Sequence, residues 1–227
     1  MPRFGLINER RNQLHEVIRL SGMNLIINDT DHPLIIKVAS IPAARMQVYF
    51  IDNEDYFHRK QILKDDSDSF FEDNDERAIF YARGVLETVR KLRWSPDIIH
   101  CQGWFTSLVP LYVKKLFKED PLFANTKVVF TVYNDEFPNP LDPSFKKKVI
   151  LEGIKNKDVE QLSDPTYVNL IKFASKYSDG MIIGSESINS EVAEFLKTYD
   201  KPVLEYQGME NYVEAYTDFY DQIFDNA

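Results

Sequence analysis

The stretch that decides the fold is DIIHCQGWFTSLVPLYVKKL, residues 97–116. Ile98 and Ile99, near its start, are apolar and β-branched, which predicts a strand over 97–101. The amphipathic segment that follows predicts a helix over 104–117. His100 and Cys101 stand where the strand should end. In open α/β sheets, ligands bind just beyond strand ends of this kind, so this strand–loop–helix corner is the first candidate site.

The same alternation continues toward the C-terminus. Strands are expected over 127–133, 180–184 and 201–206, and helices over 165–178, 188–199 and 209–224. Ser187 or Asn189 is expected to cap the second of these helices. Strands that alternate with helices predict a mostly parallel sheet covered on both faces, a Rossmann-like three-layer α/β sandwich. No repeat or low-complexity linker divides the chain, so one domain over 1–227 is expected.

The N-terminal part is richer in strands. Short β-branched runs, broken by glycine, proline and aspartate, predict strands over 14–20, 23–28, 33–39 and 46–51. An acidic loop over 64–76 leads into a predicted amphipathic helix over 76–92. Between the second and third corners, one short helix is expected within 145–154.

Composition excludes several classes of protein. The net charge of −9 and the pI near 5.0 argue against a nucleic-acid partner, which needs clustered Lys and Arg. No apolar run reaches the roughly 18 residues of a membrane span, and no signal peptide is visible. The single cysteine fits a reducing compartment, so a cytoplasmic location is expected. The four histidines show no metal-ligand spacing, and neither a metal nor a cofactor is expected.

Three strand-end corners are expected to converge, because ligands bind outside the carboxyl ends of neighbouring parallel strands. They are residues 100–106, 133–138 and 184–189.

Several blocks resemble, in order and spacing, bacterial glycogen and starch synthases. They are MQVYFIDNEDYFHR (46–59), DNDERAIFYARGVLETVRKLRWSPDIIHCQGWFTSLVPLYVK (73–114), KVVFTVYND (127–135) and SDGMIIGSESINSEV (178–192). The resemblance implies one lobe of a two-lobed GT-B glycosyltransferase that adds glucose from ADP-glucose to an α-1,4-glucan. It covers the amino-terminal, acceptor-side lobe, from residue 1 to about 195.

The first corner departs from that family. Where the family reads approximately HCHDWHT, residues 100–106 read HCQGWFT, so Gln102, Gly103 and Phe105 replace polar or titratable residues. A glycine offers no acceptor to a sugar hydroxyl, and phenylalanine cannot exchange a proton. No catalytic residue is therefore assigned, and His100, Gln102 and Gly103 are the remnant of the family's corner.

The resemblance also implies a set of substrate-binding residues. It consists of His100, Trp104, Thr106, Tyr133, Asn134 and Ser185. Tyr133 stands where the family has a histidine. Two alternatives remain open: His100 is a structural histidine, and Trp104 is a packing residue rather than a stacking platform.

Two pieces of the family are not found. The Lys-x-Gly-Gly-Leu loop that holds the nucleotide diphosphate is absent from the sequence, so the first strand–helix–strand unit is expected to be missing, and the second lobe has no counterpart. A sheet without its first strand is expected to leave a groove lined by Ile98, Val128 and Ile182.

The expected function is that of a single-lobe relative of glycogen/starch synthase, catalytically inactive alone, that binds a glucan, a maltooligosaccharide or a partner protein. Self-association is also open. The alternative is a glucosyltransferase whose second lobe comes from another chain or a longer gene product. ADP-glucose is expected as a ligand only in that alternative, because the leaving diphosphate needs charge stabilisation.

Overall fold

The computed structural model describes residues 1–225. The chain forms two compact units, residues 1–93 and the part from residue 94 onward, and each is described by itself.

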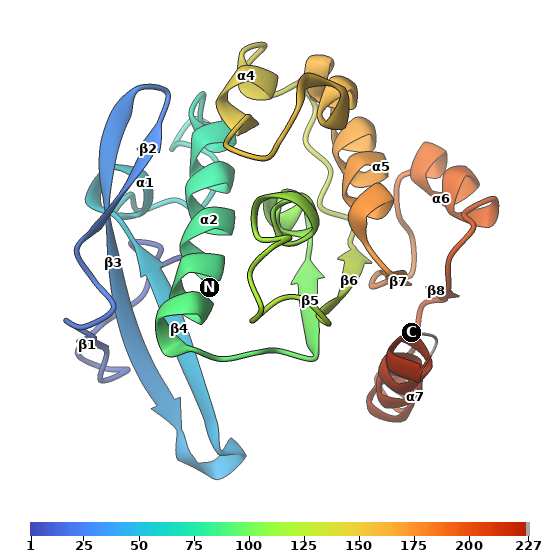
Figure 1. Ribbon diagram of the computed structural model, residues 1–227, viewed down its shortest axis with the longest axis horizontal. Helices are drawn as coiled ribbons and strands as arrows, with labels where there is room; N and C mark the ends of the chain where they lie inside the picture. The colour runs from blue at the N-terminus through green and yellow to red at the C-terminus, as the bar shows by residue number, and fades with distance from the viewer. Residues whose placement is uncertain (226–227) are drawn as a thin grey trace. The chain divides into compact units, whose positions relative to one another are not determined.

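The first unit is built on an antiparallel sheet of β1 (His15–Glu16), β2 (Met23–Ile27), β3 (Thr30–Ile41) and β4 (Met46–Asp52) (Figure 1). The long β3 pairs with all three other strands. Asn28 and Asp29 turn the chain from β2 to β3 with φ of 50° and 61°, the geometry of a tight hairpin. The predicted strand over 14–20 is wrong beyond Glu16, because residues 17–21 close turns in which Leu20 N donates to Val17 O at 2.9 Å.

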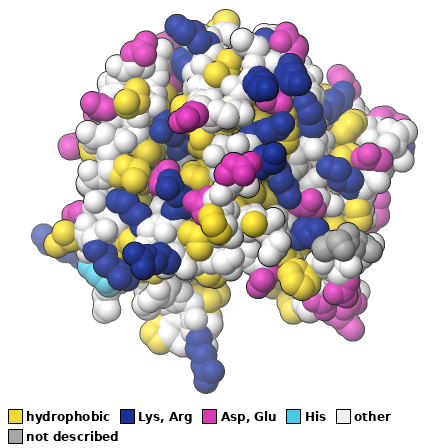
Figure 2. All heavy atoms as spheres, viewed as in Figure 1, with side chains coloured by type: hydrophobic (Ala, Val, Ile, Leu, Met, Phe, Trp, Pro, Cys, Tyr) yellow, Lys and Arg dark blue, Asp and Glu magenta, His cyan; other side chains and the backbone are white. Residues whose placement is uncertain are grey.

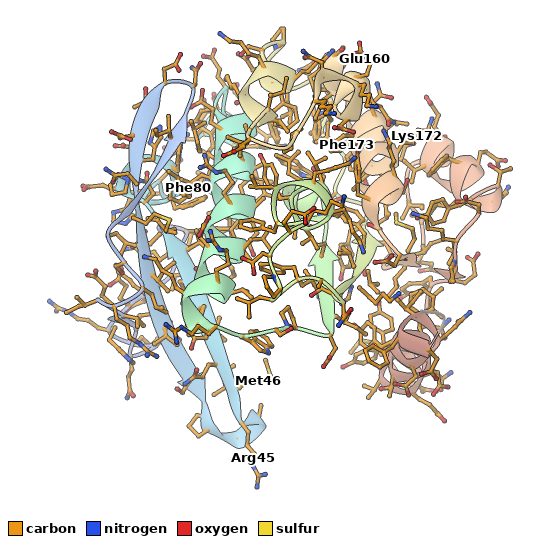
Figure 3. The ribbon with its side chains drawn as sticks, in the orientation of Figure 1. Arg45, Met46, Phe80, Glu160, Lys172 and Phe173 are labelled. Atoms are coloured by element: carbon orange, nitrogen blue, oxygen red, sulfur yellow. The ribbon has the colours of Figure 1, made fainter. Side chains whose placement is uncertain are left out.

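Two α-helices complete this unit, α1 (Glu54–Phe57) and α2 (Asn74–Leu92). Asn53 caps α1 by accepting from Tyr56 N. Helix α2 lies close against the strands at Gly84, where an added Cβ would lie 2.8 Å from Cγ2 of Ile51. Phe80, on the buried side of α2 (Figure 3), packs against the Tyr56 ring at 5.4 Å between centroids.

A buried arginine fastens the loops of the first unit. The Arg77 side chain is fully enclosed. Its Nε donates to Tyr56 O at 2.8 Å and its Nη2 to Ile62 O at 2.7 Å, while Nη1 donates to Asn74 Oδ1. The tip of the β3–β4 hairpin is the 3-10 turn η1 (Pro42–Ala44) with Arg45, whose side chain points outward next to Met46, the first residue of β4 (Figure 3).

The second unit contains a parallel sheet in the order β5-β6-β7-β8. Its strands are β5 (Ile98–Gln102), β6 (Lys127–Val132), β7 (Gly180–Ile183) and β8 (Val203–Leu204). All three strand pairs are parallel. The Rossmann-like α/β prediction is confirmed, and the near-continuous apolar strands are explained by burial on both faces.

The helices of this unit follow the strands. They are η2 (Trp104–Thr106), α3 (Val109–Leu111), the π-helical turn η3 (Tyr112–Leu116), α4 (Phe145–Val149), η4 (Asn156–Asp158), η5 (Glu160–Ser163), α5 (Tyr167–Tyr177), α6 (Ser190–Lys197) and α7 (Tyr212–Asp225). Asn189 caps α6, as predicted. The prediction of one continuous helix over 104–117 is wrong. Pro110, which has no N–H to donate, is the second residue of the short α3, and Phe117 N donates to Tyr112 O in a wider π turn.

Helix α7 covers one face of this sheet. Phe219 and Ile223 form a core cluster with Val129 and Ile182 (Figure 1 shows α7 in red). Side chains alternate along a strand, so Val128 and Phe130 point to the opposite face, and α5 also packs against β6. Val128 and Ile182 are both fully buried. The predicted groove lined by Ile98, Val128 and Ile182 is therefore wrong. Among residues 1–225, no helix is both long enough and apolar enough to cross a membrane.

Candidate functional site

The three predicted corners converge at the carboxyl edge of the parallel sheet. The Tyr133 hydroxyl, after β6, donates to Gln102 Oε1 at the end of β5 at 3.3 Å. The backbone N–H of Asn134 donates to the Ser185 hydroxyl, after β7, at 3.0 Å. These contacts join Gln102, Tyr133, Asn134 and Ser185 into one polar feature, which we call the corner rim.

Tyr133 owes its place in the rim to a glycine on the next strand. A Cβ at Gly184 would lie 2.5 Å from Cε1 of Tyr133 and 2.4 Å from Cγ2 of Thr131. The missing side chain therefore leaves the Tyr133 ring room beside the end of β7. Burial raises the pKa of the Tyr133 phenol, and the carboxylate of Asp135 raises it further, so the hydroxyl stays protonated and can donate.

Gly103 and Asp135 share one space. Gly103 has φ of +74°, and a Cβ there would lie 2.5 Å from Oδ2 of Asp135. The Asp135 carboxylate accepts from Trp104 N and from the Tyr167 hydroxyl, each at 3.0 Å. Burial raises the pKa of this carboxyl group, and the two hydrogen bonds oppose that rise. A carboxylate from the second corner thus reaches the loop where the resemblance expects an aspartate at position 103.

Sequence reasoning missed Asp135, Tyr167, Glu136 and Asn189. The Asn189 amide donates to Glu136 Oε1 at 3.0 Å and links the second and third corners. The available signal was an acidic pair directly after the strand-end Asn134. Its partners come from α5 and from the cap of α6, and their proximity depends on the fold.

Trp104 and Thr106 serve the structure of the loop. The Trp104 indole is only 2 % exposed and packs edge-on against Phe137, with centroids 4.9 Å apart. The Thr106 hydroxyl donates back to Gly103 O at 2.8 Å. A sugar ring cannot stack on the indole as it lies here, so the packing alternative describes Trp104, and both residues leave the candidate rim.

His100 points from β5 toward α7. Its Nε2 lies 2.5 Å from the Thr131 hydroxyl and its Nδ1 lies 2.8 Å from the Tyr220 hydroxyl. Burial lowers the pKa of His100 to about 4, so the ring is neutral at pH 7. Both ring nitrogens have hydroxyl partners, and the geometry is that of the structural alternative.

The thiol of Cys101, the next residue of β5, is 3 % exposed and forms no disulfide. Burial raises its pKa, which makes the thiolate scarce and the side chain unreactive in the folded chain.

The charges around the corners are negative. Residues 100–106, 133–138 and 184–189 contain Asp135, Glu136 and Glu186 but no Lys or Arg. Acidic side chains also gather at the α7 end of the face shown in Figure 2, and α7 itself carries Glu214, Asp218, Asp221 and Asp225. Within residues 1–225, no three His, Cys, Asp or Glu side chains come together as metal ligands. The corners can offer neutral donors and acceptors to a ligand, but no cation for a phosphate.

Comparisons with known proteins agree with the resemblance. The sequence model of the starch synthase catalytic domain matches residues 1–209. Glycogen synthase from Chlorobium phaeobacteroides is 34% identical over 195 residues, which are 82% of this chain and 40% of that protein. Glycogen synthase from Chlorobaculum tepidum is 34% identical over 200 residues, 80% of this chain and 41% of that protein. Glycogen synthase from Chlorobium limicola is 40% identical over 135 residues, 59% of this chain and 28% of that protein.

The fold has a solved counterpart. The catalytic domain of starch synthase IV from Arabidopsis thaliana, bound to ADP and acarbose, superposes with a TM-score of 0.70 at 20% sequence identity. The alignment covers 91% of this chain and 43% of that one. The chain therefore spans less than half the length of these curated relatives and of the aligned domain.

Proposed function

The chain belongs to the starch synthase catalytic-domain family, and from that premise we propose that it binds α-1,4-glucan chains at the corner rim and transfers no glucose by itself. The observation that carries the proposal is the rim: Gln102, Tyr133, Asn134 and Ser185 are brought together from three strands and are all neutral. Amide and hydroxyl groups match the alternating donors and acceptors of sugar hydroxyls. The loss of charged groups removes chemistry and leaves this recognition in place.

Transfer of glucose from ADP-glucose requires stabilisation of the departing diphosphate. The corners carry three acidic residues and no cation, which opposes the approach of a diphosphate. His100 is neutral and held between two hydroxyl groups, so it is unavailable as a proton donor at pH 7. These features support a lobe that recognises glucan without activating a sugar nucleotide.

A cytoplasmic location is part of the proposal. Its support is the single, buried and unpaired Cys101, which suits a reducing compartment. Glucan is the ligand we propose, and a partner protein or a second copy of the chain is the competing outcome of the tests below.

The first test is transfer of radiolabelled glucose from ADP-glucose to glycogen by the purified chain, with and without the His100→Ala substitution. We expect no incorporation above the rate without protein. Incorporation that disappears in the His100→Ala variant would overturn the inactive reading. It would favour the glucosyltransferase alternative, with the remainder of the site supplied by another chain or a longer gene product.

The second test is titration with maltoheptaose, followed by the backbone amide signals of residues 100–106 and 133–137. We expect a Kd of roughly 1 mM, about −4 kcal/mol, and a several-fold loss in Gln102→Ala and in Asn134→Ala. Trp94→Ala is the matched control, because Trp94 is 59 % exposed and precedes β5, at the opposite end of the strand. Amide signals that stay unmoved at about 10–50 mM maltoheptaose, roughly ten to fifty times that Kd, would contradict the proposal.

A further inference from the structure

A fourth corner lies at the same edge of the parallel sheet as the other three. Strand β8 runs parallel to β7, so residues 205–211 leave the sheet at its carboxyl edge before α7 begins at Tyr212. The chain then turns back. Ile223, near the end of α7, packs against Gly180, the first residue of β7. A Cβ added to Gly180 would lie 2.6 Å from Cδ1 of Ile223. Helix α7 therefore runs opposite to the strands, and its first turn lies toward the carboxyl edge of the sheet, where the corner rim is.

Tyrosines mark this fourth corner. Tyr212, Tyr216 and Tyr220 follow one another at every fourth position of α7, with ring centroids 6.0 and 6.3 Å apart. Tyr220 is anchored to His100, whereas Tyr212 is 44 % exposed. Tyr206, in the loop before α7, is 43 % exposed. The row thus passes from the half-buried Tyr220 to the exposed Tyr212.

The row is continuous with the rim. The Tyr216 ring packs edge-on to the His100 ring of β5, with centroids 6.1 Å apart, and lies against the same core cluster as Leu204 of β8. Burial raises the pKa of Tyr216, and the nearby phenols of Tyr133 and Tyr206 raise it further. The Tyr133 phenol acts in the same way on Tyr220. Tyr216 therefore lies near both Tyr133 of the rim and the exposed Tyr206. These positions come from β6, β8 and α7, and only the fold brings them together.

We propose that Tyr206, Tyr212 and Tyr216 form a stacking surface that extends the corner rim and holds further glucose units of the same α-1,4-glucan chain. The inference rests on the proposed function and names a binding surface beyond the three corners. Most of it belongs to α7, which lies outside residues 1–209 matched by the family model.

The chemistry of the row fits a neutral carbohydrate. A tyrosine ring presents an apolar face to the C–H side of a sugar ring and a hydroxyl to its O–H groups. The acidic side chains of α7, including Glu214 and Asp218, repel phosphates and do not repel a neutral chain. A ligand that reaches from the rim to Tyr206 must contain several sugar units, so affinity should rise with chain length.

The test compares two sets of variants in the full chain. Tyr206→Ala with Tyr212→Ala removes the two exposed rings. We expect it to weaken maltoheptaose binding roughly tenfold, from about three- to fourfold per ring, and to leave maltose binding nearly unchanged. Tyr206→Phe with Tyr212→Phe keeps the rings and should retain most of the affinity. Trp94→Ala, an exposed aromatic at the other end of β5, should have no effect.

The outcomes separate this inference from the proposed function. If Gln102→Ala weakens maltoheptaose binding while the double tyrosine-to-alanine variant binds normally and keeps its circular dichroism, the stacking surface is refuted and the glucan-binding rim stands. If the unmodified chain binds no maltoheptaose, the proposed function falls and the inference falls with it. Sedimentation that shows tyrosine-dependent dimers unaffected by maltoheptaose would assign the row to self-association and overturn the inference.

Discussion

The loops fastened by Arg77 and the strand-end corner at 100–106 both lie in blocks that resemble the family, yet they differ in how tightly their polar atoms are committed. The Arg77 side chain is fully buried and donates to two backbone carbonyl groups and to Asn74. At the corner, Gln102 and Asn134 are exposed. The Gln102 side chain accepts from Tyr133, and the Asn134 backbone N–H donates to Ser185. Removal of a buried partner leaves the remaining polar atoms without a hydrogen bond, whereas an exposed group can be replaced at little cost in stability. Chemistry can therefore change at the corner while the fold persists.

The largest effect should come from Arg77→Ala. The change leaves the carbonyl groups of Tyr56 and Ile62 without their donor and opens a cavity, so we expect a loss of about 3 kcal/mol or more in the free energy of unfolding, measured with urea. Arg90→Ala on the same helix is the control. Arg90 is exposed and bonds to Glu87, and its loss should cost about 0.5 kcal/mol or less. Equal losses in the two variants would remove the contrast between the regions.

The next effect concerns acid. Because the pKa of His100 falls from 6.5 unfolded to about 4 folded, the unfolded chain binds more protons between these values. The contribution of the neutral His100 ring to the free energy of unfolding is fully present above pH 6.5 and is lost as the pH falls toward 4. The loss is on the order of 3 kcal/mol. The free energy of unfolding, followed across this range, should fall less steeply in His100→Gln. Parallel profiles would show that His100 is not held neutral as described.

A smaller effect should follow from Gly103→Asp, which restores the residue of the family's corner. The new Cβ would sit 2.5 Å from Oδ2 of Asp135, at a φ of +74°, and a second carboxylate would face the first. We expect a loss of about 2 kcal/mol in the free energy of unfolding.

Two variants sharpen that measurement. Gly22→Asp has a similar φ of +86° but nothing within 4 Å, so it should show only the backbone cost of about 1 kcal/mol. Gly103→Asp combined with Asp135→Ala should regain the part of the lost stability by which Gly103→Asp exceeds Gly22→Asp. If the pair recovers nothing, Asp135 does not occupy the place of the missing aspartate.

Sequence patterns predicted much of the fold because burial on both faces leaves a clear signal. The apolar runs at 127–133 and 180–184 became β6 and β7, and the amphipathic run at 76–92 became most of α2. Local exceptions were harder to predict. The helix over 104–117 has the right periodicity, but Pro110 and the π turn ending at Phe117 divide it.

The site was less predictable, for a different reason. The convergence of three corners follows from the rule for parallel sheets, and the structure confirms it at Gln102, Tyr133 and Ser185. The role of Asp135 depends on a glycine 32 positions earlier in the chain, and the burial of His100 depends on Tyr220 at the far end of it. Contacts between residues so far apart carry no local pattern.

The enclosed Cys101 is a built-in probe of local opening. It is the chain's only cysteine and lies one residue before the end of β5, sealed from solvent. A thiol reagent in excess can label it only while β5 is transiently open. The labelling rate therefore reports how often β5 opens enough to expose the thiol. A ligand bound at the neighbouring corner would lower the rate of thiol labelling without contacting the sulfur.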